Sequence, residues 1–140
     1  MAALIAVSIV SADNIRADTS EHQEAELARF QRYAGPPVEQ FTMYDMWKWQ
    51  GLGPEWIAVW STINDPYLIR VDKSCNRLDW THGISLSQRM RWQVTQKFDY
   101  VVFGSQRCKI EEIRPVDYRA MLKAGADSRR GVDHRASGGT

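Results

Sequence analysis

Two cysteines, Cys75 and Cys108, are the residues of this chain with the widest choice of chemistry. They could form a disulfide, remain as two buried thiols, or supply half of a metal site, and the redox state of the compartment decides among the three. A zinc site needs further ligands in register, but only His82 lies near in the sequence, without C-x-x-C or H-x-x-H spacing. We therefore predict neither a metal site nor a bound cofactor.

The other reactive side chains do not form a catalytic motif. The histidines His22, His82 and His134 are expected at a helix start, a strand edge and the C-terminal tail, and no Ser or Cys beside them has a nucleophile-elbow pattern. We predict no catalytic residues and interpret Asp99 as an acid that caps a turn. An alternative stays open, in which an enzyme or small-ligand carrier has a pocket inside a barrel, lined by tryptophans and one acid, Asp45 or Asp99.

Aromatic residues are abundant, with six tryptophans and five tyrosines. Aromatic residues that alternate along a strand are usually core or cross-strand pairs, so we expect most tryptophans to be buried. Trp92 is the exception because its neighbours are polar, and three basic residues lie close to it in the sequence. We predict an exposed contact surface made of Arg89, Arg91, Trp92 and Lys97.

The overall charge argues against a polyanionic partner. The chain has 18 basic and 17 acidic residues and a net charge of +1, so it has no global field to attract nucleic acid, an anionic membrane or an acidic substrate. Base stacking on the aromatic strands is the weakest alternative for the same reason. The expected partners are an envelope protein or a small molecule, and nucleic acid is not expected.

Residues 1–12, MAALIAVSIVSA, have the pattern of a signal peptide. The apolar run ends in Val10-Ser11-Ala12, which suits signal peptidase and predicts a mature chain that begins at Asp13. No Lys or Arg precedes the run, and a true start upstream of Met1 would explain that. A buried first strand is the alternative, and the run is too short to span a membrane. A periplasmic or otherwise exported location follows, and it favours the disulfide between the two cysteines.

Two helices are predicted around the strands. Ser20 begins a capping-box pattern and Gly35 precedes two prolines, which together predict a helix over residues 20–34 behind a polar linker. Asp117 is expected to cap a short second helix that ends at Gly125.

Residues 13–125 are predicted to form one β-rich domain, followed by a disordered tail at 126–140. Alternating apolar residues and turn signals predict short antiparallel strands. They are residues 39–50, a central strand at 56–62 that is buried on both faces, 67–71, a short strand after residue 83, 98–103 and 107–113, with an exposed hairpin at 88–96. The predicted fold class is mainly β (α+β), a small open barrel or sandwich of about six strands, of which we expect the barrel.

Several short motifs follow one another in a fixed order. They are Tyr67-Leu68-Ile69, Cys75 followed by Leu78, Ile84-Ser85-Leu86-Ser87, Phe98-Asp99, Arg107-Cys108-Lys109-Ile110 and the closing Ile113-Arg114-Pro115-Val116-Asp117. Through these motifs, residues 34–117 resemble a bacterial family of small exported proteins of unknown function. The resemblance implies a periplasmic or envelope setting with a disulfide between Cys75 and Cys108, and it implies no activity. We therefore expect an uncharacterised exported protein, a non-catalytic binding or envelope-associated module stabilised by one disulfide.

Overall fold

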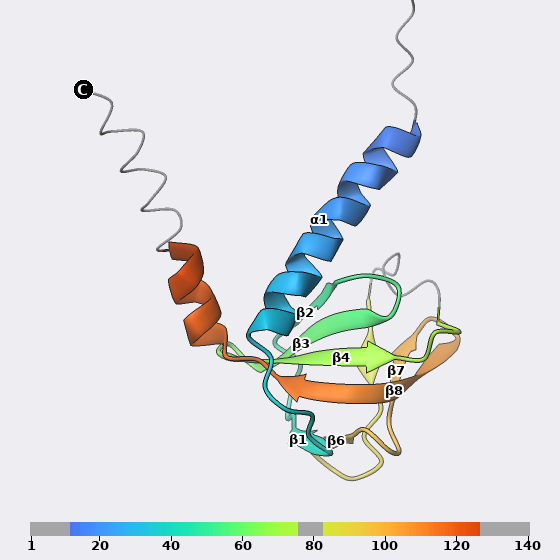
Figure 1. Cartoon of the computed structure of the whole chain (residues 1–140). Helices are drawn as coiled ribbons and strands as arrows, with labels where there is room; N and C mark the ends of the chain where they lie inside the picture. The colour runs from blue at the N-terminus through green and yellow to red at the C-terminus, as the bar shows by residue number, and fades with distance from the viewer. Residues whose placement is uncertain (1–11, 76–82, 127–140) are drawn as a thin grey trace, which may run out of the picture.

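The computed structural model describes residues 12–75 and 83–126, with side chains described from residue 20 onwards. A long N-terminal helix leads into a set of short strands, and a second helix follows the last strand (Figure 1). In chain order the elements are α1 (Ala12–Arg32), β1 (Gln40–Thr42), β2 (Lys48–Gly51), β3 (Trp56–Thr62), β4 (Asp65–Val71), β5 (Ser85–Leu86), β6 (Gln93–Thr95), β7 (Tyr100–Phe103), β8 (Gln106–Pro115) and a C-terminal helix over residues 118–126. The predicted fold class, mainly β with a helix at each end, is confirmed.

Six strands form one antiparallel sheet in the order β2-β3-β4-β8-β7-β5, and β1 pairs with β6 in a separate two-stranded sheet. The larger sheet curls into a half-barrel (Figure 1), which confirms the expected open barrel. Register shifts interrupt the ladder of β3 with β4 and that of β4 with β8. Irregularities of this kind bend a strand and increase its twist, so they help the sheet to curl.

The strand β3 is buried on both faces, as the sequence predicts. Its residues Ile57 and Val59 belong to the main core, whereas Ala58 and Trp60 belong to a second core on the opposite face. The chain returns through a turn into β4, where Ile69 lies opposite Ile57. This hairpin is therefore the layer that the two cores share.

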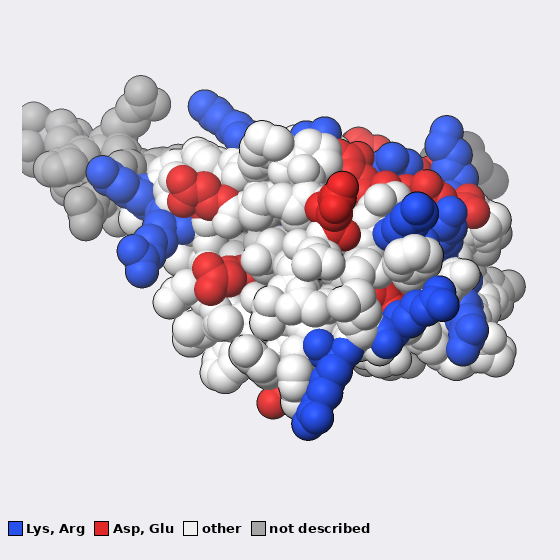
Figure 2. Space-filling view, turned by 90° about the horizontal axis from the view of Figure 1, so that it is seen from below, with Lys and Arg blue, Asp and Glu red and all other residues white. Residues whose placement is uncertain are grey.

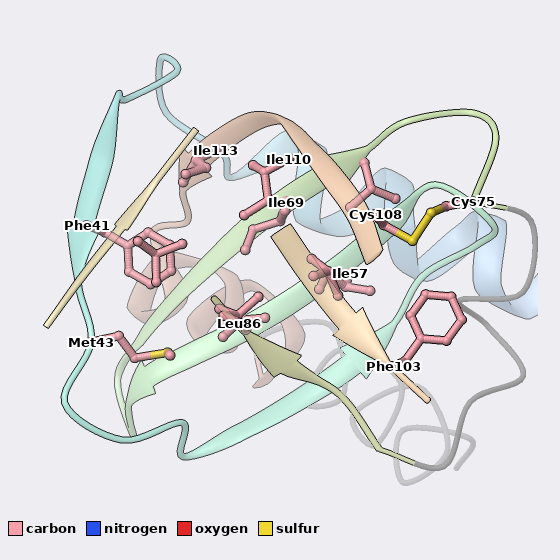
Figure 3. Close-up of a cluster of buried hydrophobic side chains, with 14 residues drawn as sticks. Phe41, Met43, Ile57, Ile69, Cys75, Leu86, Phe103, Cys108, Ile110 and Ile113 are labelled. Carbon is pink, nitrogen blue, oxygen red and sulfur yellow. A yellow bond between two sulfur atoms is a disulfide. The ribbon is translucent and has the colours of Figure 1, made fainter. Parts of the chain in front are cut away.

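The main core lies inside the half-barrel, where β1 and β6 cover it. Side chains from both sheets point toward one another there (Figure 3). The predicted disulfide joins Cys75, just after β4, to Cys108 in β8, with Cα atoms 5.7 Å apart and a sequence separation of 33. Both cysteines are buried within this core, so the cross-link ties two parts of the hydrophobic interior together.

The second core lies where the helices meet the outer face of the sheet. The rings of Phe30 from α1 and Tyr118 from the C-terminal helix each make an edge contact with the Trp60 ring, with centroids 5.8 Å apart in both pairs. Edge-to-face geometry is the favoured arrangement of aromatic pairs. These contacts place Phe30 and Tyr118 on the outer face of the sheet.

The predicted single strand at residues 39–50 is wrong. The structure breaks it into β1 and β2, which belong to different sheets. Between them the Met43 amide donates to the Trp92 carbonyl at 2.9 Å, and the Trp47 amide donates to the Trp60 carbonyl at 2.8 Å. The alternating apolar pattern continues through the break because both halves face apolar neighbours, but the backbone changes its partner at residues 43–47.

The predicted boundaries of both helices need correction. The helix α1 begins at Ala12 instead of Ser20, so the polar residues assigned to a linker are helical. They contain no Gly or Pro that would end a helix, and Ser20 lies inside the helix. The Asp117 carboxylate accepts from the Ala120 amide at 3.1 Å, which confirms the predicted cap, but the helix continues to residue 126. Within the described residues, neither helix combines the length and the apolar character needed to cross a bilayer.

Candidate contact surface

A tight turn before β6 has an unusual residue at its centre. The Gln93 amide donates to the Met90 carbonyl at 3.0 Å, which closes a four-residue turn with Arg91 and Trp92 in the middle. Trp92 has a φ of 64°, and it is the one non-glycine residue with a positive φ in the part of the chain that the structure describes. A positive φ at the third residue of a turn normally requires Gly or Asn. For a residue with a Cβ this conformation costs about 1 to 2 kcal/mol.

Hydrogen bonds from β1 and the residue after it hold this turn in place. The Trp92 carbonyl accepts from the Met43 amide at 2.9 Å, and the Gln88 side-chain amide donates to the Met43 carbonyl at 2.8 Å. The Gln93 side-chain amide donates to the Thr42 hydroxyl at 3.0 Å. The backbone of the turn is thus fixed from several sides, which is the condition under which a strained residue persists.

Asp99 joins the two ends of the segment that contains the turn. Its side chain is 1% exposed, and one carboxylate oxygen accepts from the Ser87 hydroxyl at 2.9 Å and the Arg89 amide at 3.0 Å. The other oxygen accepts from the Thr95 amide at 2.6 Å and the Thr95 hydroxyl at 2.9 Å. Because all four donors come from its own loop region, Asp99 is a structural acid, as the turn-capping interpretation expects. Asp45 is exposed, and within the described residues no hydrogen bond joins it to Asp99.

The basic side chains of the predicted surface lie over aromatic rings. The guanidinium carbon of Arg89 lies 5.0 Å from the centroid of the Phe98 ring, and the Lys97 ammonium lies 5.6 Å from the same centroid. The guanidinium carbon of Arg91 lies 4.9 Å from the centroid of the Trp92 ring. Contacts of this length are cation–π interactions, which hold the long basic side chains near the rings.

Three further residues belong to this surface that the sequence did not predict. Tyr44 lies with its ring centroid 5.4 Å from that of Trp92, and the exposed fractions of Tyr44, Met90, Phe98 and Trp92 are 67%, 56%, 48% and 39%. Met90 and Phe98 also have polar neighbours in the sequence. Polar neighbours were the feature that identified Trp92 as exposed, so the same reasoning could have predicted these two residues. Tyr44 was missed because it was assigned to a continuous strand. From here on, the contact surface means Tyr44, Arg89, Met90, Arg91, Trp92, Lys97 and Phe98.

The arginines of the contact surface differ from those in the sheet. Arg70 and Arg114 both bind the Glu112 carboxylate, the first with an N–O distance of 3.3 Å. Burial alone would raise the pKa of Glu112, but the hydrogen bonds and charges of Arg114 and Arg70 outweigh it and lower that pKa. Across residues 20–75 and 83–126, by contrast, no carboxylate lies within ion-pair distance of Arg89, Arg91 or Lys97.

Figure 2 views the molecule from below Figure 1, the side on which β1 and β6 lie. A wide area of uncharged residues is visible there, with Lys and Arg side chains projecting around it and acidic groups among them. Much of this end of the molecule is therefore uncharged.

The remaining candidates lie elsewhere. Trp60 is buried and Trp49 and Trp56 are half-buried, as expected of core residues, but Trp47 is exposed, which corrects the prediction for that ring. His22 is exposed on α1, while Trp80, His82 and His134 lie outside the described residues. Within those residues, no three His, Cys, Asp or Glu side chains converge as metal ligands would.

Among the described residues, shallow cavities lie beside the helices. One, of about 380 Å³, lies between α1 and the C-terminal helix and is lined by Arg29, Arg32 and Met121 among others. The second, of about 480 Å³, lies where α1 meets the end of β8, beside Tyr33 and Pro115. Neither contains a cluster of acids or nucleophiles, so neither resembles a catalytic site.

Comparison with known proteins identifies the family. No curated protein and no solved structure matches the chain. The model of DUF6491, a family of unknown function, matches residues 1–132, and so includes the α1 helix, both sheets and the disulfide. The resemblance to a family of unknown function, seen in the two-cysteine frame and the closing I-R-P-V-D motif, is thereby confirmed. The chain belongs to the DUF6491 family of unknown function.

Proposed function

We propose that this protein is an exported, non-catalytic binding module associated with the cell envelope, and that it binds its partner through the contact surface. The observation that carries the proposal is the backbone of Trp92, which has a φ of 64° while its ring is 39% exposed. The strained backbone offsets part of the stability that the buried portion of this side chain contributes, while more than a third of the residue stays exposed to a partner. Strained residues of this kind are concentrated at functional sites.

The composition of the surface agrees with a binding role. Binding energy at interfaces is concentrated in Trp, Tyr and Arg residues, and Met and Phe are also enriched there. The contact surface combines Tyr44, Met90, Trp92 and Phe98 with two arginines and a lysine. Because these cations have no carboxylate partner in the described part of the chain, they are available to an anionic group of a ligand.

Export is supported by two independent features. Residues 1–12 have the pattern of a signal peptide, and the Cys75–Cys108 disulfide is typical of proteins in an oxidising compartment. The alternative of a ligand carrier or enzyme with a pocket in the barrel has no comparable support. The inside of the half-barrel holds Ile57, Ile69 and Ile110, all fully buried, where such a pocket would lie.

Two measurements test the proposal. The first is the mass and thiol content of protein recovered from the periplasm of an expressing Gram-negative host. We expect a mass that fits a start at Asp13 and no thiol that reacts before reduction. A retained N-terminus with two free thiols would contradict export.

The second measurement is sedimentation of the purified, oxidised protein with isolated envelope fragments. We expect wild type to sediment and a double variant, Arg91→Ala with Trp92→Ala, to remain in the supernatant. Ile63→Ala removes an exposed apolar side chain from the turn between β3 and β4 and is the matched control. If all three proteins partition alike, the contact surface does not bind the envelope.

A further inference from the structure

We infer that the contact surface docks onto a lipid bilayer whose headgroups are anionic phospholipids. This inference rests on the proposed binding function and names the partner of the same surface. Its observations are the continuity of the surface, its local charge, and the way in which its own cations cover the aromatic rings.

Arg89 connects the two exposed groups at the ends of β6. Trp92 lies immediately before this strand, whereas Lys97 and Phe98 follow it. The Arg89 amide donates to Asp99 at 3.0 Å and its guanidinium carbon lies 5.0 Å from the centroid of the Phe98 ring, so Arg89 lies beside the second group. It also begins the Arg-Met-Arg-Trp sequence of the turn, which alternates basic and apolar side chains.

The local charge is positive although the whole chain is nearly neutral. Residues 84–98 contain three basic residues and no acidic residue. The next acid, Asp99, is buried with both oxygens occupied by donors from its own loop. The segment that carries β1 has two exposed acids, Glu39 and Asp45, against the three exposed basic residues, and the charge of Asp99 lies beneath the surface. The exposed side chains of these two segments thus carry one more positive than negative charge.

The cations that lie over the rings favour a bilayer over a nucleic acid or a sugar. Bases and sugars stack on open aromatic faces, but Arg89 and Lys97 both lie over the Phe98 ring and Arg91 lies over the Trp92 ring. At a bilayer surface this arrangement is favourable as it stands. Trp and Tyr rings prefer the headgroup region, and the apolar stems of Arg and Lys run along apolar groups while their charged ends reach the phosphates.

The small extent of the surface and its lysine favour a bilayer over a protein partner. A stable protein interface buries about 800 Å² on each side, and lysine is depleted at such interfaces. Lipid phosphates bind cations that stay hydrated. The small contact surface is therefore sufficient for weak, reversible docking. Each basic residue near an anionic membrane is expected to strengthen binding about fivefold.

The test is flotation of the full-length, disulfide-bonded protein with lipid vesicles. One set of vesicles is phosphatidylcholine with a large fraction of phosphatidylglycerol, and the other is phosphatidylcholine alone. We expect wild type to float with the anionic vesicles only, and binding to weaken as salt is raised. Arg91→Glu changes the charge by two and should lower affinity about 25-fold, since each unit of charge contributes about fivefold.

Matched controls separate charge and apolar contact from folding. Arg119→Glu reverses an exposed charge on the C-terminal helix, and Ile63→Ala removes an exposed apolar group, both outside the contact surface. Both should bind as wild type does. Each variant is checked for its disulfide and its thermal unfolding, and Arg91→Gln with Lys97→Gln replaces Arg91→Glu if the latter unfolds.

The outcomes distinguish this inference from the proposed function. Failure of wild type to bind anionic vesicles, equal binding to both vesicle types, or equal binding by Arg91→Glu and Arg119→Glu overturns the lipid inference. If wild type nevertheless sediments with envelope fragments in a way that depends on Arg91 and Trp92, the contact surface stands and its partner is a protein. Binding to a single-stranded oligonucleotide that Arg91→Glu abolishes would overturn the inference in favour of nucleic acid.

Discussion

Two tight turns of this molecule each contain a residue with a φ near 60°, but the two residues are a glycine and a tryptophan. Gly104, between β7 and β8, has a φ of 57°, and Trp92, before β6, has a φ of 64°. Glycine adopts such angles without steric cost, whereas tryptophan does not. Glycine therefore suits the backbone conformation at residue 104, whereas tryptophan is strained at residue 92.

The surroundings of the two turns explain the difference. The Gly104 turn is a two-residue hairpin loop, with Phe103 opposite Gln106, and it leads within four residues to Cys108 and the disulfide. Glycine at the first central position is the preferred residue for such a hairpin. The Trp92 turn leads only into the three-residue strand β6, and its side chains face outward. The Gly104 turn is therefore free of strain, whereas the strain in the Trp92 turn lowers the stability of the fold while its side chains stay exposed.

The largest predicted effect is the loss of stability when the Cys75–Cys108 disulfide is removed. Replacing both Cys75 and Cys108 by serine should lower the free energy of unfolding by about 3 to 4 kcal/mol, because the cross-link restricts the unfolded chain across 33 residues. Urea unfolding with and without reductant measures this loss. Reductant should destabilise wild type and leave the double variant unchanged. Equal midpoints for oxidised and reduced wild type would mean that the core needs no covalent support.

The second prediction concerns the acid beneath the contact surface. Asp99→Ala removes an acceptor of four hydrogen bonds at a buried site and should cost about 2 to 3 kcal/mol, because the donors remain buried without partners. Asp45→Ala, at an exposed position, is the control and should change stability by less than about 0.5 kcal/mol. Amide exchange of Arg89 and Thr95 should accelerate in the first variant only. Unchanged exchange at both amides would show that the loop does not depend on Asp99.

Much of the fold was predictable because its signals are local. Alternating apolar residues on either side of a turn predict the β3–β4 hairpin, and the disulfide follows from the only two cysteines of a chain that is predicted to be exported. The division of residues 39–50 between two sheets was not predictable in this way. The residues that select it, Trp60 and Trp92, accept the backbone hydrogen bonds from distant parts of the chain.

The contact surface was predictable only in part. Polar neighbours identify Trp92 as exposed, and the same rule applied to Met90 and Phe98 would have extended the surface. The cation–π contacts join residues up to nine positions apart, and the positive φ of Trp92 depends on hydrogen bonds from β1 and its neighbourhood. A pattern of residue types contains neither kind of information.

A smaller effect is predicted at Gly104. Gly104→Ala should destabilise the protein by about 1 kcal/mol, since the added Cβ meets no atom within 4 Å and only the backbone conformation opposes it. Gly83→Ala is the matched control, because its added Cβ also meets nothing within 4 Å and its φ is not in the left-handed range. Chemical denaturation should show no loss, or a slight gain, in that control. Equal stability of Gly104→Ala and wild type would remove the contrast between the two turns.

The smallest change in stability is predicted at Trp92, and it is the most informative. Trp92→Gly relieves the positive φ while it removes the ring, so its free energy of unfolding should stay within about 1 kcal/mol of wild type. Trp92→Ala removes the same ring and keeps the strain, and it should be less stable than Trp92→Gly by about 1 kcal/mol. This is the same preference for Gly over Ala that is expected at Gly104. Both Trp92 variants should lose binding to envelope fragments equally. If Trp92→Gly were much less stable than wild type, the ring would be needed for folding, and the strain at residue 92 would no longer indicate a binding role.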